Sequence, residues 1–337
     1  MELKVEEFAL NQFRSHLRAV GKYMDDPGVQ EIMLNRPDDI WIESGGDMHK
    51  VDVPAITDVN MRSAVKALAG ANHKEVQPAL DCRMPGYRIA AALPPVGING
   101  PAICIRKHAR TRRSLDDYRE AFVAGRLGDV ARQQDEPTID PADPDQVMGY
   151  IRWLVAAKKN ILIAGSTGSG KTTFLNAVLA LIPATERLLT IEDTAELQIH
   201  TPNAVSFESA PDQGVNIRTL VRLALRFRPD RIVVGEVRGA ESYDLLDALN
   251  TGHSGGACTM HADSAELALH RLESMVRMSP DTANLPLPAL RQQIANTFTA
   301  VIYCAHRGAV RGPERIVRLT GATETGYLTR TVFDATK

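Results

Sequence analysis

The 337-residue chain has no surplus of charge of either sign, few aromatic residues and no long apolar run. Its formal net charge is −2, so composition alone does not favour a nucleic acid or an anionic membrane as the main partner. No apolar stretch approaches the roughly 20 residues of a membrane-spanning helix. The first residues, MELKVEEFALNQF, are acidic and amphipathic, unlike a signal peptide. We therefore expect a soluble protein that is at most peripheral to a membrane.

The cysteines are also few and contain no CxxC pair. Four occur, far apart in the sequence: Cys82, Cys104, Cys258 and Cys304. This spacing argues against a zinc ribbon and favours reduced, mostly buried thiols in a cytoplasmic protein.

What is present is an ordinary globular composition with two differently patterned regions. With 44% hydrophobic residues, the chain is long enough for two domains with separate cores. Residues 1–123 alternate short strands and turns with one helical stretch, which predicts a smaller α+β domain with mainly antiparallel pairing. Residues 124–145 are polar, acidic and rich in proline, as in an interdomain linker. In residues 146–337, apolar strands alternate with amphipathic helices, which predicts an α/β domain with a mainly parallel sheet.

The most informative motif is GSTGSGKT at residues 165–172, between an apolar run and a helix-like run. It fits the phosphate-loop pattern GxxxxGK[ST] in the context that the pattern requires. Glycines let backbone N–H groups point at phosphate oxygens, and the following helix adds its positive end. Lys171 then reaches the β- and γ-phosphates, Thr172 can ligate Mg²⁺, and Thr173 lies near the α-phosphate. The predicted nucleotide-binding residues of this loop are Gly165, Ser166, Thr167, Gly168, Ser169, Gly170, Lys171, Thr172 and Thr173.

Acidic residues follow two later strands. Glu236 comes directly after RIVVG and is a candidate to hold Mg²⁺ or to orient the attacking water. Glu192 ends the segment LLTIE. With Asp193 and Glu196, it could polarise water or bind Mg²⁺ through the water shell of the ion. A solvated loop or a helix cap is the competing interpretation, more so for Asp193 and Glu196. Which acid orients the water stays open.

Two histidines lie in TGHSGGACTMHADS, on either side of a short strand. His261 follows that strand, where a group that senses the γ-phosphate would lie, and His253 precedes it. We predict a catalytic role for both, with His253 the weaker candidate. Metal binding is a competing interpretation, but neither HxxxH spacing nor a cysteine or acid at ligand distance supports it.

Taken together, GSTGSGKTT, IEDTAEL, RPDRIVVGEVRG and TGHSGGACTMHADS resemble the Walker A motif, Asp box, atypical Walker B motif and His box of the secretion traffic ATPases. The order and spacing of the four segments also fit. The segments LNTGHSGGACTMHADS and AICIRKHA look most similar to the type IV secretion and conjugal-transfer branch.

The resemblance implies a RecA-like ATPase domain, a homohexameric ring, ATP with Mg²⁺ bound between the two domains of each subunit, and inner-membrane secretion components as partners. It implies a location at the cytoplasmic face of the inner membrane. It also places Arg88 and Arg106 on the phosphates, a role that an arginine clamp fits physically. The function that it implies is coupling of ATP hydrolysis to assembly of, or transfer through, a secretion or conjugation apparatus.

Two alternatives remain at this point. One alternative is a pilus-retraction motor. Type II secretion and pilus-extension relatives often carry a paired CxxC insertion, which pilus-retraction motors lack as this chain does. The N-terminal sequence nevertheless looks more like the conjugal branch. The other alternative is a nucleic-acid-translocating motor, because the basic cluster KHARTRR at residues 107–113 could contact nucleic-acid phosphates. No aromatic residues are interleaved with it, so DNA binding is possible but not favoured.

Overall fold

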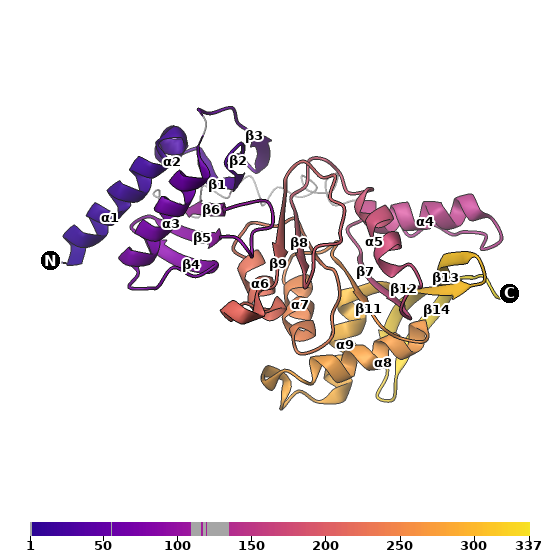
Figure 1. Cartoon of the computed structure of the whole chain (residues 1–337). Helices are drawn as coiled ribbons and strands as arrows, with labels where there is room; N and C mark the ends of the chain where they lie inside the picture. Colours follow the sequence, from indigo (N-terminus) through magenta and orange to yellow (C-terminus); the bar gives the residue numbers. More distant parts are fainter. Residues whose placement is uncertain (1, 55, 109–115, 117–118, 120–134) are drawn as a thin grey trace.

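The computed structural model describes residues 2–54, 56–108, 116, 119 and 135–337, and these residues form two β-sheets. Figure 1 shows the N-terminal sheet and its helices beside a larger C-terminal α/β region. No helix in the described ranges is long and apolar enough to cross a membrane. All four cysteines are buried and free, as expected from their spacing.

The N-terminal sheet has the strand order β3-β2-β1-β6-β5-β4, and every ladder in it is antiparallel. Its strands are β1 (Val29–Arg36), β2 (Asp39–Ser44), β3 (Asp47–Lys50), β4 (Ala79–Met84), β5 (Tyr87–Ala92) and β6 (Ala102–Lys107). The helices are α1 (Glu2–His16), α2 (Gly21–Asp25) and α3 (Asp58–Ala71). Thr57 and Asn60 form a capping box that fixes the start of α3. The predicted antiparallel α+β arrangement is confirmed.

The C-terminal sheet has the order β14-β13-β12-β7-β11-β10-β8-β9. Its strands are β7 (Asn160–Gly165), β8 (Leu188–Glu192), β9 (Ala204–Glu208), β10 (Arg231–Val234), β11 (Ala257–Met260), β12 (Phe298–Arg307), β13 (Val310–Ala322) and β14 (Tyr327–Asp334). The strands from β12 to β9 pair in parallel, whereas β13 and β14 add an antiparallel hairpin edge. The predicted mainly parallel sheet is therefore confirmed.

Helices cover both faces of this sheet, because its central strands are apolar on both sides. In β7, Ile161 and Ile163 pack in one core with α4 and α5, while Leu162 and Ala164 pack in another with α6 to α9. The helices are α4 (Pro144–Ala156), α5 (Lys171–Leu179), α6 (Ile217–Ala224), α7 (Glu241–Asn250), α8 (Ala265–Val276) and α9 (Leu287–Thr297), with short 3₁₀ turns at Arg18–Val20, Pro211–Gln213 and Pro280–Thr282. The parallel strands all end at one edge, which we call the carboxyl edge, where ligands of such sheets usually bind.

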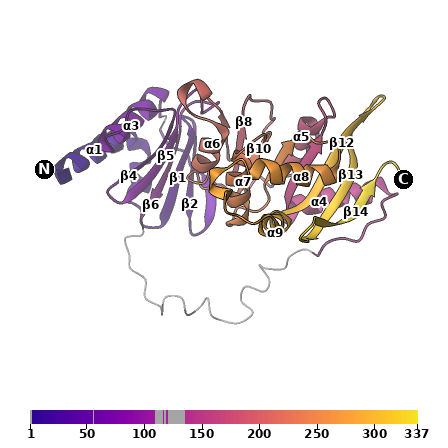
Figure 2. The ribbon, with the colours of Figure 1, turned by 90° about the horizontal axis from the view of Figure 1, so that it is seen from below.

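The N-terminal sheet packs against β9, at the side of the C-terminal sheet away from the hairpin (Figures 1 and 2). Met33 and Ala90 belong to the same buried cluster as Leu189 and Phe207. Backbone bonds join the two regions, since Ile98 N donates to Ser206 O at 3.2 Å and Glu208 N donates to Val96 O at 2.9 Å. In the strand order, β8, β10 and β11 lie between β9 and β7. The N-terminal sheet, which packs against β9, is therefore several strands away from β7.

A buried arginine strengthens this contact. Arg187 has no exposed surface, and its Nε donates to Phe227 O at 2.8 Å. Its Nη1 donates to Asn35 Oδ1 of β1 at 2.6 Å and to Asn203 Oδ1. A second arginine, Arg228, bonds both carboxylate oxygens of Glu43 in β2, at 2.8 and 3.1 Å. Such charge-assisted bonds hold the two regions in one relative orientation.

Residues 124–134 of the predicted linker lie outside the described residues, and the rest of the linker is attached to the C-terminal region. Glu136 accepts bonds from Arg318 Nε at 3.0 Å and Arg330 Nη2 at 2.5 Å, and Tyr150 Oη lies 3.1 Å away. Helix α4 already begins at Pro144. The exact domain limits stay a prediction.

Candidate functional site

The phosphate-loop motif forms the turn between β7 and α5, as its sequence context predicts. Gly168 and Gly170 have φ angles of +72° and +89°, a region that residues with a Cβ rarely adopt. A Cβ atom on Gly165 would lie 2.3 Å from the carbonyl oxygen of Cys304. Glycines are therefore required both for the curl of the loop and for its close packing on β12.

Lys171 is buried at the start of α5, and its side chain folds over the loop. Its Nζ donates to Gly165 O at 3.0 Å and to Ser166 O at 2.8 Å. Burial lowers the pKa of Lys171, while the nearby Glu236 carboxylate acts in the opposite direction. An ammonium group in this position can exchange two carbonyl partners for phosphate oxygens without leaving the loop.

Glu192 ends β8 at the carboxyl edge, next to Gly235 at the end of β10. A Cβ atom on Gly235 would lie 2.9 Å from Glu192 Cγ, so this glycine makes room for the carboxylate. Glu192 Oε1 accepts the backbone N–H groups of Glu196 and Leu197, each at 3.0 Å. Burial raises the pKa of Glu192 against these bonds. The carboxylate is thus partly occupied in holding its own loop.

Glu236 lies between three cationic or ionisable side chains. Its Oε2 accepts a bond from Arg238 Nη2 at 2.8 Å, and His261 Nε2 lies 3.1 Å from its Oε1. Burial raises the pKa of Glu236, but the bond from Arg238 and the charges of His261 and Lys171 outweigh burial, so the net pKa is lowered. The buried Oε1 accepts no hydrogen bond of good geometry within the described residues. Glu236 is therefore ionised and still has acceptor capacity.

These groups line one pocket of about 300 Å³ at the carboxyl edge. Its lining residues are Thr167, Gly168, Lys171, Thr172, Glu192, Asp193, Thr194, Glu196, Gly235, Glu236, Arg238, Thr259 and His261. The structure thus brings together the loop, both acidic segments and one of the two histidines.

The donor set of this pocket fits Mg²⁺ held together with a nucleotide. Thr172 offers a hydroxyl group, and Glu236 offers the buried Oε1, which accepts no hydrogen bond of good geometry from the described groups. In the described ranges, no group of three or more His, Cys, Asp or Glu residues is arranged to hold a metal by itself. Mg²⁺ at phosphate sites usually needs only one or two protein groups, with phosphate and water oxygens as the others.

Three predicted site residues outside the phosphate loop do not line this pocket. His253 precedes β11, so it lies at the edge opposite to His261, and its Nδ1 is 3.2 Å from Ala248 O. Arg88 pairs with Asp81 at 2.7 Å, and Arg106 pairs with Glu31 at 2.7 Å, all within the N-terminal sheet. Nothing in the geometry of one chain supports a shared site for these three residues and Lys171.

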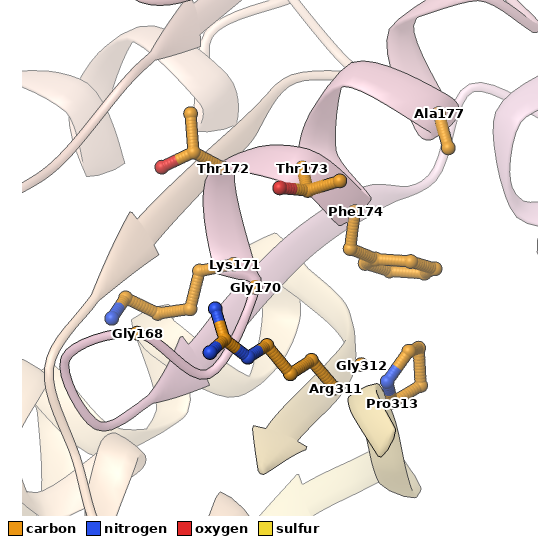
Figure 3. A pocket seen from close by; sticks show the side chains of 10 residues that line it. All are labelled: Gly168, Gly170, Lys171, Thr172, Thr173, Phe174, Ala177, Arg311, Gly312 and Pro313. Carbon is orange, nitrogen blue, oxygen red and sulfur yellow. The ribbon is translucent and has the colours of Figure 1, made fainter. Parts of the chain in front are cut away.

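Two groups near the loop escaped the sequence analysis. Arg238 lies in the segment RPDRIVVGEVRG without an assigned role, yet it bonds Glu236 and lies 3.5 Å from Asp193. Arg311 of β13 lines a second pocket on the other side of the loop, which Figure 3 shows together with Phe174 and Pro313. No motif could have found Arg311, because only the pairing of β12 with β7 brings the hairpin to the loop.

The fold and this pocket define a P-loop enzyme that hydrolyses nucleoside triphosphates. Residues 140–324 match the family model described as "Type II/IV secretion system protein", which is more than half of the chain. The chain therefore belongs to this family, and the predicted secretion ATPase is confirmed.

Curated relatives agree with the family over nearly the whole length. The chain is 33% identical to the "Type IV secretion system protein PtlH homolog" of Bordetella bronchiseptica, covering 90% of this chain and 93% of the relative. It is 33% identical to the "Conjugal transfer protein TrbB" of Rhizobium radiobacter, covering 95% and 96%. The crystal structure of the VirB11 ATPase from the Brucella suis type IV secretion system, in complex with sulphate, superposes with a TM-score of 0.81 at 28% identity and covers 97% and 95%.

Proposed function

We propose that the chain is a homohexameric ATPase that couples ATP hydrolysis to assembly of, or substrate transfer through, a type IV secretion or conjugation apparatus. The observation that carries the proposal is the pocket in which Lys171 faces Glu236, Glu192 and His261. The names of the relatives, which include a conjugal transfer protein and type IV secretion proteins, support the cellular role.

In this proposal the loop N–H groups and Lys171 bind the β- and γ-phosphates, and Thr172 with Glu236 holds Mg²⁺. The ion neutralises the charge that develops on the transferred phosphoryl group. Glu192 or Glu236 orients the attacking water. Glu236 is the better candidate, because its carboxylate is ionised and has an oxygen free of backbone bonds, whereas Glu192 Oε1 already accepts two N–H groups.

We propose that His261 reports the state of the γ-phosphate to the rest of the molecule. It lies 3.1 Å from Glu236 and at the end of β11, directly beside the strand that precedes the loop. Contacts of Arg88 and Arg106 with phosphate also stay a proposal. They require another copy of the chain or a large displacement, since both arginines are paired within the N-terminal sheet at the far side of the C-terminal sheet.

Nucleic-acid translocation gains no specific support from the described residues. In the basic cluster at residues 107–113, Lys107 donates to Tyr23 O at 3.0 Å, and residues 109–113 lie outside the description. For cellular location, we propose the cytoplasmic face of the inner membrane, with secretion components of that membrane as partners.

The test is a mass and turnover measurement on the full chain. Light scattering with and without Mg²⁺ and a slowly hydrolysed ATP analogue should show six copies in the assembled state. Turnover should depend on Mg²⁺, be lost in Lys171→Ala, and not respond to DNA. A monomer at all concentrations with nucleotide present would contradict the ring, and DNA stimulation would favour a nucleic-acid motor.

A further inference from the structure

The pocket at the carboxyl edge is lined by two side chains with a permanent positive charge, Lys171 and Arg238, and they have different partners. Lys171 Nζ is bonded to carbonyl oxygens of the phosphate loop, whereas Arg238 is bonded to carboxylates. Neutral carbonyl partners leave the charge of Lys171 available to a phosphate group. The charge of Arg238 is instead balanced by the protein itself, so the two cations of this pocket have different roles.

Arg238 connects acidic residues that follow two neighbouring strands. Its Nη2 donates to Glu236 Oε2 at 2.8 Å, and its Nη1 lies 3.5 Å from Asp193 Oδ2. Asp193 follows β8 and Glu236 follows β10, and these strands pair in parallel. The other oxygen of Asp193 accepts a bond from Ser209 Oγ at 3.0 Å. The guanidinium group therefore ties Glu236 to the loop after β8, whose acid is itself held in place.

The backbone of Arg238 is fixed from two sides. Glu241, the first residue of α7, accepts the N–H groups of Arg238 and Gly239 on its Oε1, at 2.6 and 2.7 Å. On the other side, the buried Val237 donates its N–H group to Thr259 O of β11 at 2.9 Å. The turn that carries Arg238 is thus held between α7 and β11. A side chain that starts from such a fixed turn can position its partner precisely.

The two carboxylate oxygens of Glu236 are bonded differently. Oε2 accepts the bond from Arg238, whereas Oε1 lies 3.1 Å from His261 Nε2 and accepts no hydrogen bond of good geometry from the described groups. A charge-assisted bond at one oxygen restricts rotation of the whole carboxylate, so it also fixes the direction of the other oxygen. Precise placement matters for a group that orients water or Mg²⁺, because a displacement of about 1 Å can lower a rate about a hundredfold.

We propose that Arg238 is a positioning residue for Glu236: it holds Oε2 and thereby directs Oε1 into the pocket where ATP is hydrolysed. The inference rests on the proposed role of Glu236 in hydrolysis. Arg238 does not bind the nucleotide, because the two ends of its guanidinium group are engaged by Glu236 and Asp193. It acts through Glu236 on the rate of hydrolysis and leaves the affinity for ATP unchanged.

The experiment measures kcat and the affinity for a slowly hydrolysed ATP analogue in full-length variants. Arg238→Ala should lower kcat about tenfold, the effect of losing one charge-assisted bond, and should leave the affinity within about twofold. Its urea midpoint should not change, because the Arg238 side chain is 62% exposed and exposed ion pairs add little stability. In a Glu236→Ala background, Arg238→Ala should lower kcat by less than about twofold, since no carboxylate remains to be positioned.

Arg222→Ala is the matched control, because Arg222 is 58% exposed, pairs with Asp244 at 2.6 Å and does not line this pocket. The inference is overturned if Arg238→Ala has the kcat of Arg222→Ala, or if it binds the analogue about tenfold more weakly. A tenfold loss that persists in the Glu236→Ala background would also overturn it. Lys171→Ala separates the two levels. If it hydrolyses ATP normally, the proposed function has failed, whereas an inactive Lys171→Ala beside a fully active Arg238→Ala refutes only the role of Arg238.

Discussion

Two polar clusters lie at opposite edges of the C-terminal sheet, and their side chains differ in how completely they are bonded. At the edge where strands begin, Arg187 and Arg231 are almost fully buried. Arg231 donates to Glu186, to Val155 O at 2.8 Å and to Gly255 O at 3.2 Å, and Arg187 bonds Asn35 of the N-terminal sheet and the Phe227 carbonyl of the C-terminal region. At the carboxyl edge, Ser169 Oγ and Glu236 Oε1 are buried without a hydrogen bond from any described group.

This difference separates groups that stabilise the fold from groups arranged for a ligand. A buried charge with several protein partners gains its bonds on folding, so removing it should cost stability. A buried polar atom without a partner costs stability in the chain alone and gains a bond only when substrate, metal ion or water is bound. Substitutions at the two edges should therefore act on different quantities.

The largest expected effect is that of Lys171→Ala on turnover. Loss of the phosphate-binding charge should lower kcat by at least about a hundredfold. The free energy of unfolding should stay within about 0.5 kcal/mol or rise slightly, because burial already lowers the pKa of Lys171 and its charge is therefore held at a cost. Steady-state hydrolysis and urea unfolding measure both. Turnover within a few-fold of wild type would refute the assignment of the loop.

Glu236→Gln should lower turnover by about 10²- to 10³-fold and leave ATP affinity nearly unchanged. The amide keeps the shape of the side chain and loses the charge that orients water or Mg²⁺. Glu192→Gln is the matched variant at the same edge, and we expect a smaller loss of turnover with some loss of stability, since Glu192 Oε1 holds two backbone N–H groups. An inactive Glu192→Gln with an active Glu236→Gln would show that the two acids are reversed.

The opposite result is expected at the other edge. Arg187→Ala should lower the free energy of unfolding by about 3 kcal/mol, because Asn35, Asn203 and the Phe227 carbonyl lose a buried donor. The kcat of the folded fraction should remain within about twofold, since no bond of Arg187 reaches the loop. Arg152→Ala, at an exposed position of α4, is the control. A loss of kcat without a loss of stability in Arg187→Ala would break the comparison.

Much of the carboxyl edge could be predicted from the sequence, because its signals are local. A strand followed by GSTGSGKT fixes the loop, and acids or a histidine directly after apolar strands must lie at the edge where parallel strands end. For this reason Lys171, Glu192, Glu236 and His261 are found in one pocket. The prediction for His253 lacked this step: it stands before β11, not after it, and so lies at the other edge.

Contacts between distant segments could not be predicted in this way. From the sequence alone, Arg187 looks like an ordinary surface arginine. Its partner Asn35 comes close only because the N-terminal sheet packs against β9. From the sequence alone, Arg311 looks like an exposed charge in a hairpin. It lies beside the phosphate loop only because β12 pairs with β7. Neither position has a periodic or motif signal, because the partner is set by strand order. The position of the N-terminal arginines relative to the loop is undetermined by sequence for the same reason.

The smallest effect that we predict concerns His261. His261→Ala should keep ATP affinity within a few-fold and lower turnover about tenfold, the effect of losing the 3.1 Å contact with Glu236 or a single hydrogen bond to the γ-phosphate. His261→Gln can still donate a hydrogen bond and should retain substantial activity. The measurement is the pH dependence of kcat for the wild type and both variants.

The pH profile distinguishes a sensor from a general base because Glu236 does not interfere. The pKa of Glu236 is lowered, so its carboxylate stays ionised in and above the pH range in which a glutamate usually titrates. The stabilisation from its ion pairs is lost only when the pH falls through that lowered pKa. Burial raises the pKa of Glu192 in the same pocket, so the profile of Glu192→Gln is measured as well. An acid limb of kcat between about pH 5 and 8 that persists in Glu192→Gln and is absent from His261→Gln would be that of an imidazole. A sensor predicts that His261→Gln keeps most of the wild-type rate across this range. If Gln and Ala lose equal activity and the wild type shows that limb, His261 transfers the proton, and the water at Glu236 is activated by the histidine and not by the carboxylate.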